Sequence, residues 1–173
     1  PFPMDNIHSR NLFVNYLRKK KFKNPVVVAP DAGAAKEAGR LARDLDFPLA
    51  VLTKERPRFN IAEVTSVVGD VEGKTCIIFD DMIDTGGSVC AAHEALIKQG
   101  ANKDIFLVAT HPVFSGLAVE KMLKKGFKEV IVTDTIPVPK AKHFKGLTIL
   151  SVAPLLARVI RSVHEARSVT DVV

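Results

Sequence analysis

The chain has 173 residues, of which 47% are hydrophobic and 25% are charged, and its formal net charge is +6. This composition excludes a disordered or low-complexity protein and fits one α/β core of ordinary size. The two cysteines give no disulfide framework, and no apolar stretch is long enough to cross a membrane. We therefore expect a single domain over residues 1–173, a cytoplasmic location and no membrane partner.

Hydrophobic periodicity predicts alternating helices and strands along the whole chain. In chain order, it predicts a helix at 9–17, a strand at 26–29, a helix ending at 45, a strand at 48–53, an edge strand or hairpin arm at 63–68, a strand at 76–79, a helix at 89–96, a strand at 105–110, a helix at 116–124, strands at 129–133 and 147–150, and a helix at 152–163. This order predicts an α/β fold, a parallel sheet with helices on both faces and a small β-hairpin flap after the second strand.

Connection rules predict where a site would form. Right-handed crossovers place the loops that follow parallel strands at one edge of the sheet. We therefore expect the loops at Asp31, Asp80, His111 and Asp134 to surround a shared cleft.

The most informative stretch is residues 77–88, IIFDDMIDTGGS, in which a buried strand meets two carboxylates and a glycine turn. Gly86 and Gly87 let successive N–H groups face one point at a helix N-terminus, which suits a phosphate. Asp80 and Asp81 would repel that phosphate, so they need hydroxyl donors or a metal ion. Ribose 5-phosphate satisfies both halves of the motif. The alternative is an acidic turn with no ligand.

This stretch resembles the ribose-phosphate loop of phosphoribosyltransferases, and Asp84 is similar to the third acid of the ribose-phosphate diphosphokinase branch, the PRPP synthetases. The resemblance implies a phosphoribosyltransferase-like fold. It also implies that Asp80 and Asp81 hold the ribose hydroxyls, directly or through magnesium. The 5-phosphate would be cradled by Asp84, Thr85, Gly86, Gly87 and Ser88.

Two further loops support the resemblance. The stretch KERPR at 54–58 resembles the flexible catalytic loop of the synthetases, which implies that Lys54 and Arg56 stabilise the transferred diphosphoryl group; a solvated charged turn is the alternative. The second is the diphosphate loop, which corresponds to Asp31, Ala32, Gly33 and Ala34. There Asp31 matches an acid that helps to hold Mg²⁺, although it could also cap the next helix. We expect His111 to be satisfied by neighbouring backbone.

The resemblance covers nearly the whole chain but only the second half of a synthetase. It implies that this chain is the carboxyl-terminal domain of a two-domain parent. The parent would be a homo-oligomer, and its amino-terminal domain would complete the ATP site. The implied reaction converts ATP and ribose 5-phosphate into phosphoribosyl diphosphate and AMP, and the isolated domain could be inactive.

Three other functions stay open at this stage. A nucleobase phosphoribosyltransferase uses the same ribose loop, although Asp84 and the KERPR stretch argue against it. A regulatory homologue that lacks activity would keep the fold. A nucleic-acid-binding module is the weakest alternative, because the chain has no Trp and one Tyr to interleave with its cations. We therefore expect no nucleic-acid partner.

Overall fold

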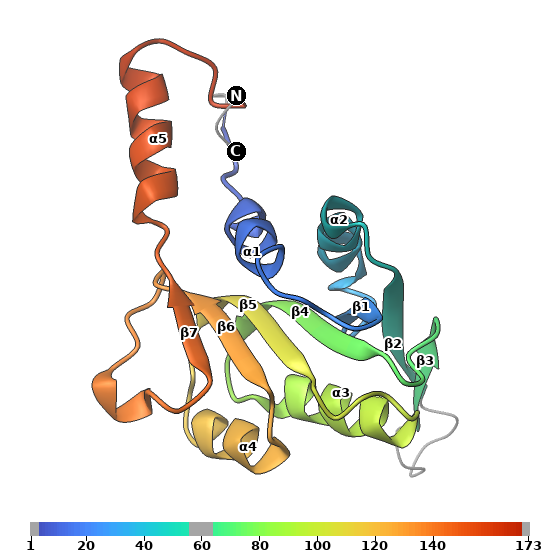
Figure 1. Ribbon diagram of the computed structural model, residues 1–173. Coiled ribbons are helices and arrows are strands. Elements are labelled where there is room, and N and C mark those ends of the chain that lie inside the picture. The colour runs from blue at the N-terminus through green and yellow to red at the C-terminus, as the bar shows by residue number, and fades with distance from the viewer. Residues whose placement is uncertain (1–3, 56–63, 171–173) are drawn as a thin grey trace.

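The computed structural model describes residues 4–55 and 64–170, and within them the chain forms one seven-stranded sheet (Figure 1). The strands are β1 (Pro25–Ala29), β2 (Leu49–Glu55), β3 (Val64–Val68), β4 (Thr75–Ile83), β5 (Phe106–Pro112), β6 (Glu129–Thr133) and β7 (Leu147–Leu150). The helices are α1 (Arg10–Leu17), α2 (Ala35–Leu45), α3 (Gly87–Lys98), α4 (Ala118–Lys125), α5 (Ala153–His164) and the short 3₁₀ helix η1 (Lys140–Lys142).

The strand order is β3-β2-β1-β4-β5-β6-β7, and every neighbouring pair is parallel except β2 and β3. The predicted α/β fold is therefore confirmed, and β3 is the antiparallel edge strand expected after the second strand. Residues 56–63, which would form the tip of the predicted flap, lie outside the described residues.

The order of the strands reverses direction between β1 and β4. From β1 the chain moves outward to β2, whereas from β4 it moves to β5 on the opposite side. The ends of these two neighbouring strands, paired as Val28 with Ile78, therefore open a crevice between diverging connections. Ligands of open α/β sheets bind in such a crevice.

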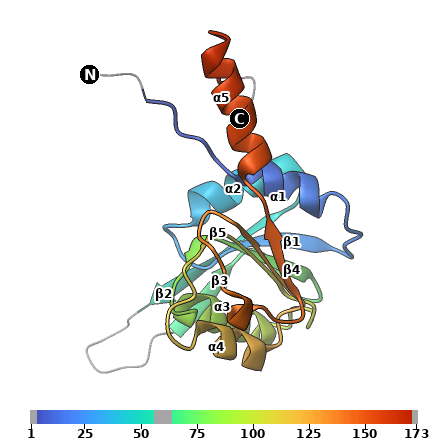
Figure 2. The same cartoon turned by 90° about the vertical axis from the view of Figure 1, so that its left-hand side faces the viewer.

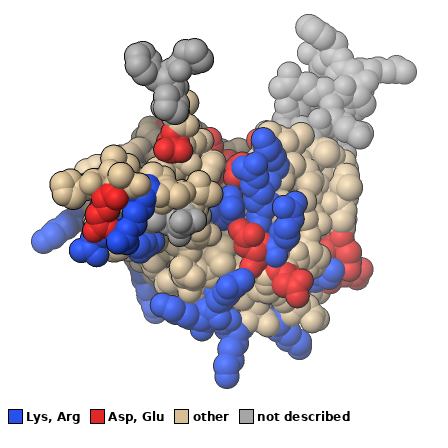
Figure 3. Space-filling view, turned by 90° about the horizontal axis from the view of Figure 1, so that it is seen from above, with Lys and Arg blue, Asp and Glu red and all other residues tan. Residues whose placement is uncertain are grey.

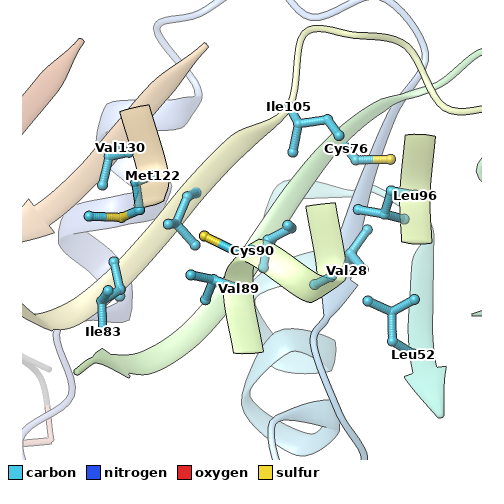
Figure 4. Packing of buried hydrophobic residues seen from close by; sticks show 14 of the residues in the cluster. Val28, Leu52, Cys76, Ile83, Val89, Cys90, Leu96, Ile105, Met122 and Val130 are labelled. Atoms are coloured by element: carbon cyan, nitrogen blue, oxygen red, sulfur yellow. The ribbon is translucent and has the colours of Figure 1, made fainter. Parts of the chain in front are cut away.

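Helices cover both faces of the sheet, as predicted. In Figures 1 and 2, α1 and α2 lie on one face and α3 and α4 on the other. Side chains alternate between the two cores along each strand, so that Cys76 and Ile78 pack on the α3 side and Ile77 on the α1 side. Figure 4 shows Cys76 in the core on the α3 side. Cys76 and Cys90 are buried free thiols.

The surface over α1 and α2 carries both charge signs. Arg10 pairs with Asp44 and Arg40 pairs with Glu37, each at 2.6 Å. Figure 3 shows the molecule from above, with acidic and basic side chains next to each other. The pair of Arg10 with Asp44 links α1 to α2, whereas Arg40 and Glu37 pair within α2.

The predicted end of the strand at residue 79 was wrong. Asp80 and Asp81 lie inside β4, because the strand continues to Ile83 through pairing with β5. Ser9 is at the N-cap of α1 but makes no side-chain capping bond there. Its hydroxyl instead lies 2.7 Å from that of Thr110 at the end of β5.

Helix α5 projects away from the sheet (Figures 1 and 2). Its side chains Ile160 and Val163 are 68% and 65% exposed. Among residues 4–55 and 64–170, no helix is both long and apolar enough to cross a membrane.

Candidate functional site

The two acids of β4 face opposite sides of the sheet, as neighbouring strand residues do. Asp80 is half-buried and Asp81 is exposed, and the N–H of Asp81 donates to Oδ1 of Asp80 at 2.9 Å. Both acids border the crevice beyond β1 and β4. Asp81 alone also borders a further cavity on the α1 side of the sheet.

Two cavities make up the crevice and share three acidic lining residues, Asp31, Asp80 and Asp81. The larger, about 390 Å³, is lined by Asp31, Gly33, Ala34, Glu37, Phe79, Asp80 and Asp81. The smaller, about 240 Å³, is lined by Asp31, residues 80–86, Ser88 and Val89. The loops after β1 and β4 therefore share one cleft, as the connection rules predicted.

The electrostatics of this cleft are unfavourable for a free carboxylate. Burial raises the pKa of Asp80 to about 6, and the negative charges of Asp81 and Asp31 act in the same direction. The N–H of Asp81 opposes these effects only in part. A cation or several hydroxyl donors placed between the acids would stabilise their charged form.

The loop after β4 presents backbone donors at the start of α3. Gly86 has a φ of +72°, a left-handed conformation that glycine adopts without strain, and the helix begins at the next residue. The N–H groups of residues 85–88 make no hydrogen bond to another described residue. Free N–H groups at a helix N-terminus form a site for an anion such as phosphate.

The loop after β1 is shaped around Asp31. Its Oδ1 accepts a hydrogen bond from the N–H of Ala34 at 3.0 Å. A Cβ on Gly33 would lie 3.1 Å from the same oxygen, so glycine leaves room for the carboxylate. Since the N-cap of α2 is Ala34, Asp31 stabilises the preceding turn and does not cap the helix. Ala32, at the tip of this turn, does not line the larger cavity.

The acids fit Mg²⁺ only when a ligand shares it. Among the described residues, no three His, Cys, Asp or Glu side chains are grouped as a ready metal site. Mg²⁺ commonly takes one or two carboxylates and completes its shell with water and phosphate oxygens. Asp31 and its neighbours in the cleft supply carboxylates of the right kind, so the residues fit an ion held jointly with a phosphorylated ligand.

The predicted catalytic cations lie at the limit of the described structure. The backbone of Lys54 belongs to β2 and pairs with Thr65 of β3. The side chain of Lys54 and the whole of Arg56 lie outside the described residues. Their catalytic role stays a prediction.

Of the other two predicted loops, neither lines the two cavities of the crevice. His111 lines a cavity of about 360 Å³ together with Asp81, and its Nδ1 lies 2.9 Å from the hydroxyl of Thr135. The partner of the His111 ring is therefore a side chain, whereas we had expected neighbouring backbone. Asp134 instead accepts the N–H of Val152 at 2.8 Å, at the start of α5.

Sequence reasoning did not identify two other lining residues, Glu37 and Phe79. Glu37 lies in the first turn of α2 and pairs with Arg40 on the same helix. One sequence pattern could have indicated Glu37, namely an acid in the first turn of a helix that follows a ligand-binding loop.

Comparison with known proteins identifies relatives of this chain. A family model described as the phosphoribosyl synthetase-associated domain matches residues 52–173. A ribose-phosphate pyrophosphokinase of Synechococcus elongatus is 46% identical over 171 residues, which are 98% of this chain and 51% of that protein. The Bacillus subtilis enzyme of the same name is 42% identical over 97% of this chain and 53% of its own length. The chain thus spans about half the length of these curated relatives.

Solved structures agree with the sequence relatives. Phosphoribosylpyrophosphate synthetase from Mycobacterium smegmatis superposes with a TM-score of 0.83 at 43% identity, over 91% of this chain and 51% of that one. The adenine phosphoribosyltransferase of Giardia lamblia, at 17% identity and a TM-score of 0.58, shares the fold alone. The expected phosphoribosyltransferase-like fold is confirmed. The chain belongs to the phosphoribosyl synthetase-associated domain family and is a partial relative of the ribose-phosphate pyrophosphokinases.

Proposed function

We propose that this chain provides the ribose 5-phosphate side of a ribose-phosphate pyrophosphokinase. The complete enzyme would transfer diphosphate from ATP to ribose 5-phosphate and release AMP. The observation that supports this proposal best is the shared cleft. In it, free N–H groups of the loop after β4 lie beside acids from both β1 and β4.

The cleft offers complementary groups to the two ends of ribose 5-phosphate. The N–H groups of residues 85–88 would donate to the 5-phosphate at the N-terminus of α3. Asp80 and Asp81 would accept hydrogen bonds from the ribose hydroxyls. These bonds would favour the charged form of Asp80, whose pKa is raised by burial and, to a smaller extent, by the neighbouring acids. The sugar would then bridge the anion site and the acids.

For the transfer step, the anomeric hydroxyl would attack the β-phosphorus of ATP. The bond between that phosphorus and the oxygen bridging to the α-phosphorus would break, and AMP would leave. Lys54 and Arg56 would stabilise the charge that develops on the transferred group. Asp31, with the neighbouring acids, would hold Mg²⁺, which when bound neutralises the charge of the phosphates.

Calorimetry tests the acceptor site directly on this chain. With Mg²⁺ present, we expect ribose 5-phosphate to bind and ribose without the phosphate to bind far more weakly. Replacing both cleft acids, as Asp80→Asn with Asp81→Asn, should weaken binding by at least about tenfold. Asp134→Asn is the matched control, because that acid lies outside the cleft and binds the N-terminus of α5. Absence of binding to the unmodified chain would refute the proposal.

Two activity assays separate the alternatives. A chain completed with the rest of its parent should form phosphoribosyl diphosphate from ATP and ribose 5-phosphate. A nucleobase phosphoribosyltransferase would release diphosphate from phosphoribosyl diphosphate when a base is added, with no need for ATP. A regulatory homologue would do neither. Mg²⁺ dependence and the expected homo-oligomer belong to the same proposal.

A further inference from the structure

The loop that would bind the phosphate is held from behind by one neighbouring segment. Three successive backbone carbonyls, those of residues 83–85, accept hydrogen bonds from the region between the end of β5 and α4. The N–H groups of Phe114 and Ser115 donate to the first two at 2.9 Å each. The ammonium group of Lys121, on α4, donates to the carbonyl of Thr85 at 3.2 Å.

These bonds determine where the N–H groups of the loop point. In a trans peptide unit the C=O and the following N–H point in opposite directions. No cis peptide occurs among the described residues. Carbonyls held toward α4 therefore turn the N–H groups of residues 84–86 away from it. A cationic donor on a carbonyl also polarises the peptide and strengthens the N–H of the same unit as a donor.

The segment behind the loop is itself firmly anchored. Ile83 and Met122 are each 1% exposed and belong to the same core cluster, in which Figure 4 shows both. A Cβ on Gly86 would lie 3.5 Å from the carbonyl oxygen of Ala118, so the first turn of α4 packs directly against the loop. Helix α4 is therefore a fixed support.

The corner before α4 is held in an uncommon conformation. Phe114 is 1% exposed and has a φ of +49°, which is unfavourable for a residue with a side chain. The ammonium group of Lys142 donates to its carbonyl at 2.7 Å. Burial and this hydrogen bond hold the corner in place, as strained backbone requires.

We propose that Lys121 is a positioning residue for the phosphate loop. Its ammonium group holds the Thr85 carbonyl on the α4 side, so that the N–H of Gly86 faces the cleft where phosphate would bind. The choice of phosphate as the ligand rests on the proposed function, whereas the role of Lys121 in holding the loop does not. Lys121 contacts the loop from outside the cleft and lines neither of the two cavities.

Three variants test this role. Lys121→Met removes the donor and keeps the length of the side chain, and Lys121→Arg keeps a cationic donor. Lys124→Met is the matched control, because Lys124 is exposed on the same helix and makes no hydrogen bond or ion pair among the described residues. By calorimetry we expect Lys121→Met to weaken ribose 5-phosphate binding by about fivefold. Lys121→Arg should stay within about twofold of the unmodified chain, and Lys124→Met should not change the affinity.

Amide hydrogen exchange gives a second measurement that needs no ligand. The amides that donate to the carbonyls of the loop should exchange faster in Lys121→Met than in Lys124→Met. These are the N–H groups of Phe114, Ser115 and Cys90. Equal exchange in the two variants would overturn the inference. If the unmodified chain binds no ribose 5-phosphate, the proposed function fails and exchange alone decides the role of Lys121.

The salt dependence of ribose 5-phosphate binding gives a third measurement. A loss of affinity in Lys121→Met that disappears at high salt would mean that the charge acts at long range, and would also overturn the inference. A loss that persists at high salt and is restored by arginine supports it.

Discussion

At the scale of single residues, two glycines with similar backbone angles differ in what surrounds them. Gly86 has a φ of +72° and lies against α4, whereas Gly73 has a φ of +63° and faces open space. We expect Gly86→Ala and Gly73→Ala each to lower the free energy of unfolding by about 1 kcal/mol, because a side chain disfavours this conformation. Urea denaturation measures both losses.

Only Gly86→Ala should weaken ribose 5-phosphate binding. Relief of its strain rotates peptide groups at the anion site, whereas Gly73 lies in a remote turn where its N–H donates to Gly100. Equal affinities of the two variants would show that the conformation of Gly86 does not shape the site.

Asp80 is expected to reduce stability at neutral pH. Its pKa of about 6 in the folded chain exceeds its ordinary value of 3.8, so the folded state binds the extra proton between these values. Stability therefore falls as pH rises from about 4 to 6. Asp80→Asn should raise the free energy of unfolding at pH 8 and change it much less near pH 4, while it weakens ligand binding. A variant less stable than the unmodified chain at pH 8 would contradict this assignment.

At the scale of elements, the sequence predicted whether a segment is a helix or a strand better than it predicted where that segment ends. Short apolar runs identified β6 and β7 to the residue, because the boundaries of these strands coincide with changes in composition. The end of β4 was missed, since the pairing of Asp80 with Ala109 depends on a partner strand and not on the local pattern. The hydrogen bond from the N–H of Val152, just before α5, to Asp134 is likewise a contact between distant segments.

Helix α1 is attached to the far strands by one polar cluster around Glu129. Its carboxylate accepts hydrogen bonds from Nζ of Lys20 at 2.7 Å, the hydroxyl of Tyr16 at 2.5 Å and the hydroxyl of Thr148 at 2.7 Å. Burial alone would raise the pKa of Glu129, but these hydrogen bonds lower it below its ordinary value. The cluster therefore favours the ionised carboxylate.

We expect Glu129→Gln to lower the free energy of unfolding by about 2 kcal/mol at pH 7. Because the pKa is depressed in the folded state, this stabilisation is present above the ordinary pKa of 4.5 and is lost as pH falls through the folded value. Denaturation at pH 7 and pH 3 measures the difference. If the free energies of unfolding of Glu129→Gln and the unmodified chain differ by the same amount at both pH values, the expectation is contradicted.

Helices α3 and α5 have the same length, 12 residues, but different support. Helix α3 buries six side chains, whereas α5 buries Leu155 and Ser162 and exposes Ile160. Few buried apolar contacts mean a low free energy of local opening. We expect the amides of α5 to exchange much faster than those of α3 in hydrogen-exchange measurements. Equal protection would mean that α5 is held by contacts that the described residues do not show.

At the scale of the whole molecule, the cleft could be predicted because it follows from connectivity. Right-handed crossovers bring the ends of β1 and β4 together whatever the details of packing, so Asp31 and Asp80 were correctly expected to meet. The place of Glu37 in the wall and the support from Lys121 depend on packing between helices, which no local pattern encodes. The two-domain parent and the homo-oligomer stay predictions.

The pairing of β1 with β4 also bears on how the chain folds. It joins Pro25 to Thr75 at the centre of the sheet, so the chain between them must close a long loop before the central strands can pair. Such non-local pairing is intrinsically slow, because the loop must close before the contacts between the strands can form. The cleft forms only when these two strands meet, so the ability to bind a ligand should return no earlier than the centre of the sheet does.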